Sequence, residues 1–298
     1  MITENINMIK DKGETIMKKF KKTGIAVLAA ALSLTVFAGC QSSDQAADTQ
    51  EPAQEAKGKI TVAASPVPHA EILSQVKETL AEKGYELEVV EFTDYVQPNL
   101  VVDAGDVDAN FFQHKPYLDD FNAEKGTKLV PVASVHFEPL GIYAGKSTDL
   151  ANIPDGAAIA VPNDTTNEAR ALLLLEANGL IKIKEGAGLS ATKNDIAENP
   201  HNIEIVELEA AQVSRVIGEV DFVVLNGNYA LDAGLSVSDA VAKEEQDSEA
   251  AQTYANILVV KEGSEEREDI KALVEALKSE AVKTYISETY KGAVVAID

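Results

Sequence analysis

Hydrophobic residues from position 59 onward alternate between the spacing of a strand and the spacing of a helix. Residues 59–64 form a β-branched run, and the apolar positions between Ile72 and Leu80 then recur on one helical face until Gly84 supplies a stop. Further strands are predicted at residues 85–92, 107–112, 128–135, 157–161, 203–207, 222–225 and 254–261. Helices are predicted at residues 94–102, 115–125, 166–178 and 266–290. Strands that alternate with helices predict an α/β fold with a mostly parallel sheet.

The length of this patterned region indicates two lobes. Roughly 240 residues follow position 58, which is more than the usual single domain of about 100 to 150 residues. We expect residues 59–140 and 257–298 to form lobe 1 and residues 141–256 to form lobe 2, so that the last helices rejoin the first lobe. Ligands of open α/β sheets bind beyond the carboxyl ends of the strands, so the residues that follow each strand are the candidates for chemistry.

The first 39 residues have the pattern of a leader followed by a secretory signal. A group of lysines that begins at Lys18 precedes an apolar run at residues 25–37, and small residues then lead into Cys40. The run is shorter than the roughly 20 residues that cross a bilayer, which disfavours a transmembrane anchor. Cys40 is the only cysteine, so the pattern predicts cleavage before it and lipid attachment to it. Met17 is the expected start, because the acidic residues within 1–16 do not fit a signal peptide.

The charge of the mature chain disfavours nucleic acid as a partner. The first 39 residues hold 6 basic and 3 acidic residues of the total 26 and 49, which leaves 20 basic and 46 acidic residues, a net charge of −26. Residues 41–58 carry no large apolar side chain, so we expect residues 40–58 to be a lipidated flexible linker. The predicted location is the extracytoplasmic face of the cell membrane, with the lipid as the tether.

Aromatic residues gather after the predicted strands of lobe 1, although aromatics make up only 5% of the chain. Tyr95 follows the second strand, and Phe111, Phe112, His114 and Tyr117 lie at or just after the third. Adjacent strand residues point to opposite faces, so at most one of the two phenylalanines serves a given face of the sheet. Alternation alone gives even odds for each to lie in a pocket or in the core.

Polar residues follow two predicted strands of lobe 2. Residues 163–170 open a helix, whose first amides attract an anion, and Arg170 adds a planar cation that suits a carboxylate. The alternative is a surface arginine paired with Glu168 or another acid. Asn226 and Asn228 flank a glycine after the strand at 222–225, where they either hold a ligand or only shape a turn.

Four long motifs resemble the NlpA family of methionine-binding lipoproteins. They are Asn110-Phe111-Phe112-Gln113-His114-Lys115-Pro116-Tyr117-Leu118, Pro162-Asn163-Asp164 with Thr166-Asn167 and Arg170-Ala171-Leu172, Gly179-Leu180-Ile181, and Asn226-Gly227-Asn228-Tyr229-Ala230. The resemblance spans residues 59–298 in order. It implies a type II periplasmic-binding-protein fold, in which two α/β lobes close on a free amino acid and deliver it to the permease and ATPase of a methionine ABC importer. Residues 249–253 depart from the family pattern, in which Asp-Ser is followed directly by Pro-Tyr-Ala-Asn.

The resemblance also implies roles for single residues. The aromatic side chains would form a slot for the thioether of methionine, Arg170 would bind its carboxylate, and the amides and His114 would contact both ends of the head group. The residues expected to bind the ligand are Tyr95, Phe111, Phe112, His114, Tyr117, Asn167, Arg170, Asn226 and Asn228. L-methionine, its D-isomer, its sulfoxide and a small methionine-containing dipeptide remain alternatives.

Three other classes of protein are weighed against this interpretation. An enzyme is not expected, because the chain has no phosphate loop, dinucleotide fingerprint or Gly-x-Ser-x-Gly motif. A receptor for a metal ion would need several histidines to converge, yet His69, His114, His136 and His201 lack close spacing on one helix, and we expect no metal and no cofactor. An adhesin would need no pocket between lobes.

Overall fold

The computed structural model describes residues 57–245 and 252–297. The described residues belong to one compact unit. Several predicted features lie outside the described residues. They are the signal, Cys40, most of the linker, and residues 249–251 of the segment that departs from the family pattern.

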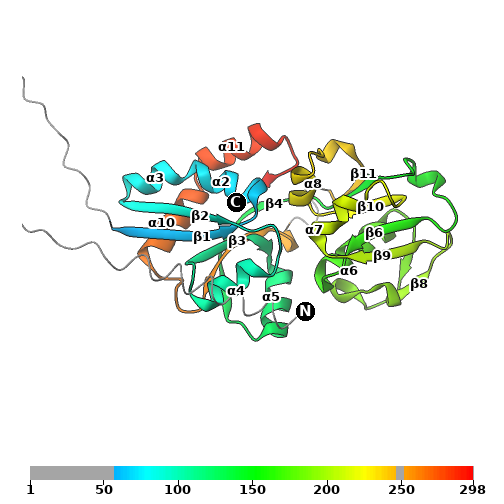
Figure 1. Ribbon diagram of the computed structural model, residues 1–298, viewed down its shortest axis with the longest axis horizontal. Helices are drawn as coiled ribbons and strands as arrows, with labels where there is room; N and C mark the ends of the chain where they lie inside the picture. Colours follow the sequence, from blue (N-terminus) through cyan, green and yellow to red (C-terminus); the bar gives the residue numbers. More distant parts are fainter. Residues whose placement is uncertain (1–56, 246–251, 298) are drawn as a thin grey trace, which may run out of the picture. The chain divides into compact units, whose positions relative to one another are not determined.

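The first sheet has six strands in the order β13-β4-β12-β3-β1-β2, of which β1 to β4 are labelled in Figure 1. Its strands are β1 (Gly58–Ala64), β2 (Tyr85–Glu91), β3 (Ala109–His114), β4 (Leu129–Phe137), β12 (Asn256–Lys261) and β13 (Val295–Ala296). We call this sheet and the helices on it lobe 1. Strands β1, β2 and β3 run parallel, whereas β12 runs antiparallel to both β3 and β4.

Helices cover both faces of the first sheet, because its strands are apolar on both sides. The helical segments of lobe 1 are η1 (Pro66–Ala70), α2 (Glu71–Gln75), α3 (Lys77–Glu82), α4 (Gln97–Ala104), α5 (Lys115–Lys125), α10 (Glu268–Leu277) and α11 (Glu280–Tyr290). On β12, Leu258 packs in the core with α2, α3, α10 and α11, while its neighbour Val259 packs with α4 and α5. Asp94 caps the start of α4, accepting hydrogen bonds from the backbone N–H groups of Val96 and Gln97 at 2.8 Å each.

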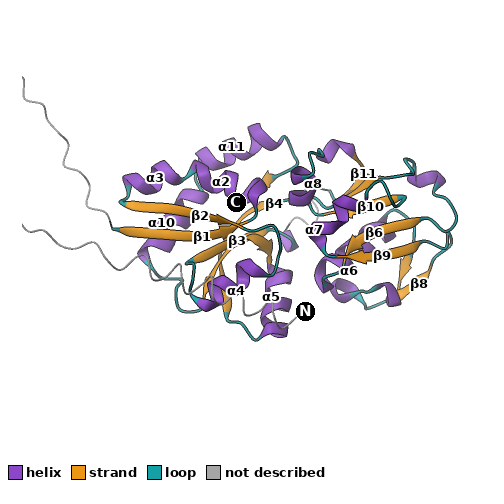
Figure 2. Cartoon of the chain, in the orientation of Figure 1, coloured by secondary structure: helices purple, strands orange, loops and turns teal. Residues whose placement is uncertain are grey.

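The second sheet has five strands in the order β11-β5-β10-β6-β9. Its strands are β5 (Gly141–Ala144), β6 (Ala158–Pro162), β9 (Glu204–Leu208), β10 (Phe222–Leu225) and β11 (Ala240–Lys243). The helices beside it are α6 (Thr165–Ala177), α7 (Ala210–Val213) and α8 (Gly227–Asp232) (Figure 2). Strand β7 (Lys182–Ile183) pairs separately with β8 (Ile196–Glu198). Short 3₁₀ turns lie at η2 (Leu150–Asn152), η3 (Gly188–Ser190), η4 (Lys193–Asp195), η5 (Ser214–Val216) and η6 (Val237–Asp239). We call this part lobe 2.

The chain passes from lobe 1 to lobe 2 through residues 138–140 and returns between β11 and β12. Strand β12 enters the first sheet from lobe 2. It does not follow a helical crossover within the sheet, which is the connection that keeps neighbouring strands parallel. In the second sheet, β5 runs antiparallel to β10, and β11 runs antiparallel to β5. Both sheets are mixed, so the prediction of a mostly parallel sheet is wrong. Among the described residues, no helix has the length and hydropathy that a membrane span requires.

Candidate ligand-binding site

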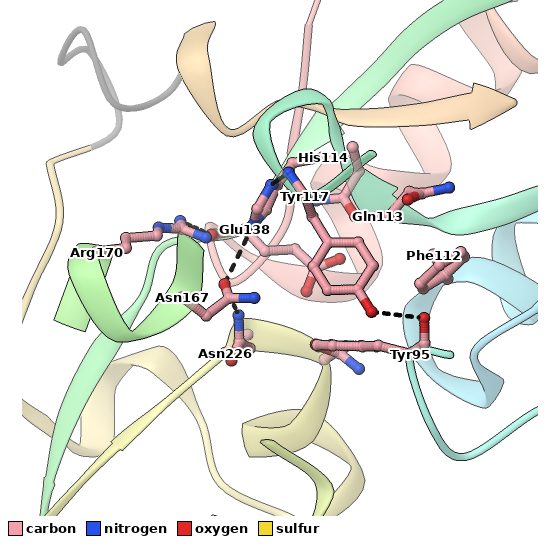
Figure 3. A pocket seen from close by; sticks show the side chains of 12 residues that line it. Tyr95, Phe112, Gln113, His114, Tyr117, Glu138, Asn167, Arg170 and Asn226 are labelled. Carbon is pink, nitrogen blue, oxygen red and sulfur yellow. Dashed lines mark hydrogen bonds between the residues drawn. The ribbon is translucent and has the colours of Figure 1, made fainter. Parts of the chain in front are cut away.

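A cavity lies between the two lobes, at the carboxyl ends of strands from both sheets, and its empty space, which includes open solvent, measures about 340 Å³. Twelve residues line the cavity, and Figure 3 shows their side chains: Tyr95, Phe112, Gln113, His114, Tyr117, Glu138, Asn167, Arg170, Asn226, Gly227, Asn228 and Asn256. Eight of the nine residues predicted from the sequence are among them.

Phe111 is the exception and requires a correction. Its side chain is fully buried in the core of lobe 1, where its ring meets those of His69 and His136 edge-on at centroid distances of 4.7 and 5.3 Å. Strand alternation places Phe112 on the opposite face of β3, with Tyr117 and Phe121. Phe112 therefore lines the cavity, and Phe111 does not.

An aromatic wall bounds the cavity on the side of lobe 1. The ring of Tyr95 lies 5.8 Å from those of Phe112 and Tyr117, measured between centroids, and 4.9 Å from that of Tyr229 in lobe 2. The hydroxyl of Tyr117 donates to the backbone oxygen of Tyr95 at 2.9 Å, as Figure 3 shows. The hydroxyl of Tyr95 in turn donates to Oδ1 of Asn228 at 2.5 Å, so this wall bonds directly to lobe 2.

His114 connects the end of β3 to helix α6 of the other lobe. Its Nδ1 accepts the backbone N–H of Tyr117 at 3.2 Å, so Nε2 carries the proton and donates to Oδ1 of Asn167 at 3.1 Å. The same Oδ1 accepts from Nδ2 of Asn226 at 2.8 Å (Figure 3). Burial, with a further contribution from the charge of Arg170, lowers the pKa of His114 to about 3. His114 is consequently neutral at physiological pH.

Arg170 lies at the cavity with only 4% of its surface exposed. Its Nε and Nη2 donate to the two carboxylate oxygens of Glu244 at 2.8 and 2.5 Å, and Nη2 also donates to the backbone oxygen of Glu138 at 3.0 Å. The guanidinium stacks on the ring of Tyr254, 4.2 Å from its centroid. The alternative interpretation was a surface arginine paired with Glu168 or another acid. Arg170 is indeed paired with an acid, Glu244, but it is buried and does not lie on the surface. None of these hydrogen bonds uses Nη1.

Four lining residues were not predicted, and Glu138 is the most consequential. It is 5% exposed, and burial raises the pKa of its carboxyl group. It follows β4 directly, so the rule that ligands lie after strands would have found it had the strand not been predicted to end at residue 135. The other three are Gln113, Gly227 and Asn256, of which Gln113 and Gly227 lie within motifs named above.

The histidines do not all converge. His69 and His136 meet Glu138, and the potential ligand atoms of these three buried residues lie within 4.8 Å of one another. Nε2 of His136 is 2.7 Å from Oε1 of Glu138, and Nε2 of His69 is 3.4 Å from the same oxygen. His114 lines the cavity but is not part of this group, and His201 neither lines the cavity nor belongs to the group.

Known proteins match this chain over the whole region that carries the site. The family model described as NlpA lipoprotein matches residues 60–297. The D-methionine-binding lipoprotein MetQ of Salmonella typhimurium is 38% identical over 279 residues, which cover 93% of this chain and 98% of the relative. A solved structure from Ruminococcus gnavus is 63% identical with a TM-score of 0.80, and it covers 80% of this chain and 99% of its own.

A nutrient-binding protein of Burkholderia cenocepacia, solved with methionine bound, is 44% identical with a TM-score of 0.76, and it covers 80% of this chain and 100% of its own. The expected two-lobed substrate-binding-protein fold is confirmed by these likenesses. With the family model matching from the first strand of lobe 1 to the last, the chain belongs to the NlpA lipoprotein family.

Proposed function

We propose that this protein captures free methionine, or a close analogue, between its lobes and delivers it to an ABC importer. The observation that carries the proposal is the division of the cavity into an aromatic side and a charged side. Tyr95, Phe112 and Tyr117 supply the first, and Arg170 and Glu138 supply the second. Relatives that bear the name of methionine-binding lipoproteins, or were solved with methionine, support the choice of ligand.

The aromatic wall suits an unbranched thioether. Sulfur is polarizable and favours the edges of aromatic rings, and each such contact stabilises by about 0.3 to 1.5 kcal/mol. Two or three contacts of this size give methionine a finite advantage over leucine, whose branched end lacks them. Gln113 lies near the wall but is held by a closed set of amide hydrogen bonds with Asn99 and Asn110, which fixes its orientation.

The charged side suits the head group of an amino acid. Arg170 offers a permanently charged, planar donor whose orientation Glu244 and the ring of Tyr254 set in advance, so little freedom remains to be lost on binding a carboxylate. The side chains of Asn167, Asn226 and Asn228 line the same region and offer both donors and acceptors.

Closure of the lobes would report occupancy to the importer. The bonds from Tyr95 to Asn228 and from His114 to Asn167 join the lobes around the cavity. A ligand that contacts both sides adds to these bonds only in the closed state, so binding shifts the equilibrium between open and closed forms toward closed.

Membership of a lipoprotein family makes this a membrane-anchored protein on the extracytoplasmic side. We further propose that a lipid on Cys40 is the anchor, because the net charge of −26 of the mature chain argues against a polybasic contact with lipid headgroups. Cys40→Ala should release the protein from the membrane fraction. Retention of this variant after a salt wash would refute the lipid anchor.

Thermal unfolding with a panel of single amino acids tests the proposed ligand. Methionine should raise the melting temperature most, since a ligand that binds only the folded state stabilises it by mass action. Stabilisation by zinc or manganese, with no response to any amino acid, would favour a metal receptor instead. No response to either would remove the basis for a binding function.

A further inference from the structure

Strand β3 carries one extra residue where it borders the cavity. Residues 257–258 of β12 are consecutive, but their partners on β3, Gln113 and Phe111, are two positions apart. Phe112 is therefore the additional residue of a β-bulge. Such a bulge bends the strand locally and turns side chains away from the direction that a regular strand would give them.

The bulge brings two consecutive side chains to the cavity. In a regular strand, neighbouring side chains point to opposite faces of the sheet. Here Phe112 packs with the aromatic rings of α5, and Gln113 bonds to Asn99 of α4, which covers the same face of the sheet. Both residues therefore line the cavity, one with a ring and the other with an amide (Figure 3).

Gln113 belongs to a closed group of three buried amides, which we call the amide triad: Asn99, Asn110 and Gln113. Nδ2 of Asn99 donates to Oε1 of Gln113 at 3.0 Å, and Nε2 of Gln113 donates back to Oδ1 of Asn99 at 2.6 Å. The same Nε2 donates to Oδ1 of Asn110 at 2.9 Å. An amide nitrogen carries two hydrogens, so both donors of Gln113 are used within the triad.

The bulge and the amide triad depend on each other. Residues three positions apart in a regular strand point to opposite faces, so the side chains of Asn110 and Gln113 meet because of the extra residue between them. Asn110 also donates to Oδ1 of Asn99 at 2.8 Å and to the backbone oxygen of Pro98 at 3.2 Å, which ties this part of β3 to α4. A shift to regular pairing would break these buried hydrogen bonds, so the triad holds the bulge in place.

The tyrosines of the aromatic wall also direct their donors at the protein. The hydroxyl of Tyr117 donates to the backbone oxygen of Tyr95, and the hydroxyl of Tyr95 donates to Oδ1 of Asn228. The side chain of Phe112 has no polar atom. The wall and Gln113 therefore present aromatic rings and an amide whose donors are already bonded.

We propose that Asn99 and Asn110 are positioning residues that withhold the amide of Gln113 from the ligand, so that the site selects an apolar thioether and rejects a side chain that ends in a polar oxygen. This inference rests on the proposed function and narrows its ligand, because methionine sulfoxide differs from methionine by a single oxygen atom. That oxygen is a hydrogen-bond acceptor, and a buried acceptor without a donor is costly. Gln113 directly follows Phe112 on the lining of the cavity, so its amide would meet the polar end of a side chain if its donors were released.

A direct hydrogen bond from Gln113 to the ligand is the competing interpretation. Turning this amide toward the cavity would remove the partners of Asn99 and Asn110, both of which are fully buried. The sulfur of a thioether is a weak acceptor and does not offset that loss. The closed triad is therefore the favoured arrangement when methionine is bound.

Calorimetric titration of the parent protein with L-methionine, L-norleucine and L-methionine sulfoxide tests the inference. Norleucine has the same unbranched length without the sulfur, and should bind about 2- to 10-fold more weakly than methionine. The sulfoxide should bind on the order of 10- to 100-fold more weakly than methionine, because its oxygen is buried without a donor. A parent that binds no methionine refutes the proposed function, whereas a parent that binds methionine and its sulfoxide equally well refutes this inference alone.

Releasing the amide should relax this selectivity. Asn99→Leu removes the acceptor of one N–H of Gln113, which then donates to the sulfoxide oxygen, and the preference for methionine over its sulfoxide should shrink by at least about fivefold. Asn110→Leu releases the other N–H and should act in the same direction. Asn122→Leu loses side-chain hydrogen bonds elsewhere in lobe 1, away from the cavity, and is the matched control that should keep the parent preference.

A double variant separates positioning from general damage to the core. Asn99→Leu combined with Gln113→Leu removes the released amide, so the preference for methionine over its sulfoxide should return to within about twofold of the parent value. A packing defect caused by Asn99→Leu would persist in the double variant. If Asn99→Leu keeps the parent preference, or if the double variant does not regain it, the positioning role is refuted. If these variants do not fold, the titration of the parent decides.

Discussion

Three buried histidines should make this protein lose stability in mild acid. Burial lowers the pKa of His69 to about 4 and those of His114 and His136 to about 3, all below the ordinary value of about 6.5. The unfolded chain therefore binds more protons than the folded chain as soon as the pH falls below about 6.5. Stability is complete above that pH and declines until the pH reaches the folded-state values.

The expected loss can be worked from these values. At pH 5 each histidine is about 1.5 units below its unfolded pKa and still neutral when folded, which costs about 2 kcal/mol per residue at about 1.4 kcal/mol per unit. Three such residues cost about 6 kcal/mol, a large part of a typical stability of about 5 to 15 kcal/mol. Glu138 acts in the opposite direction, because burial raises its pKa and its protonation in acid favours the folded state. The net loss should therefore be somewhat smaller.

Denaturant titrations at pH 7.5 and pH 5 measure this loss directly. The free energy of unfolding of the parent should fall steeply between the two, and His136→Gln should lose about a third less than the parent, although it is less stable at pH 7.5. His201→Gln, at a partly exposed position, is the control and should keep the parent's slope. A slope in His136→Gln equal to that of the parent would mean that His136 is already protonated at pH 5 in the folded protein, so that burial does not lower its pKa as expected.

The remaining predictions concern the cavity. Phe112→Ala should weaken methionine by about 2 to 3 kcal/mol and narrow its advantage over alanine in calorimetric titrations, whereas Phe111→Ala should cost about 3 to 5 kcal/mol of folding stability and leave the order of ligands unchanged. If both variants changed the relative affinities of methionine and alanine equally, the assignment of Phe111 and Phe112 to opposite faces of β3 would be refuted. Arg170→Ala should weaken every amino-acid ligand by about 3 to 5 kcal/mol and also lower the melting temperature, since the largely covered carboxylate of Glu244 loses the cation that it is paired with. Methionine binding equal to the parent's would exclude Arg170 from the head-group site.

Much of the core could be predicted because buried strands are continuous apolar runs. The predicted strand at 222–225 is β10, and the two-residue alternation of β3 correctly required its phenylalanines to face opposite ways. Strands β5, β11 and β13 were not predicted, because they are only two to four residues long and β11 alternates between half-buried and exposed positions. The prediction of mostly parallel strands was wrong in both sheets, because parallel and antiparallel strands have the same periodicity of apolar residues.

The sequence predicts the arrangement of the binding site less completely than it predicts the fold. Alternation separated Phe111 from Phe112 but could not tell which face of β3 meets the cavity, because that depends on where lobe 2 lies. Arg170 and its partner Glu244 are 74 residues apart, and no local pattern connects them. Glu138 was missed because Val135 is the last residue of the apolar run, although β4 continues to Phe137.

Calorimetric titration of the protein, freed of bound ligand by unfolding and refolding, tests the central claim most directly. The division of the cavity into an aromatic side and a charged side predicts one site per chain, with L-methionine bound more tightly than leucine, glutamine or histidine. Tighter binding of glutamine or histidine, or no heat with methionine, would contradict it.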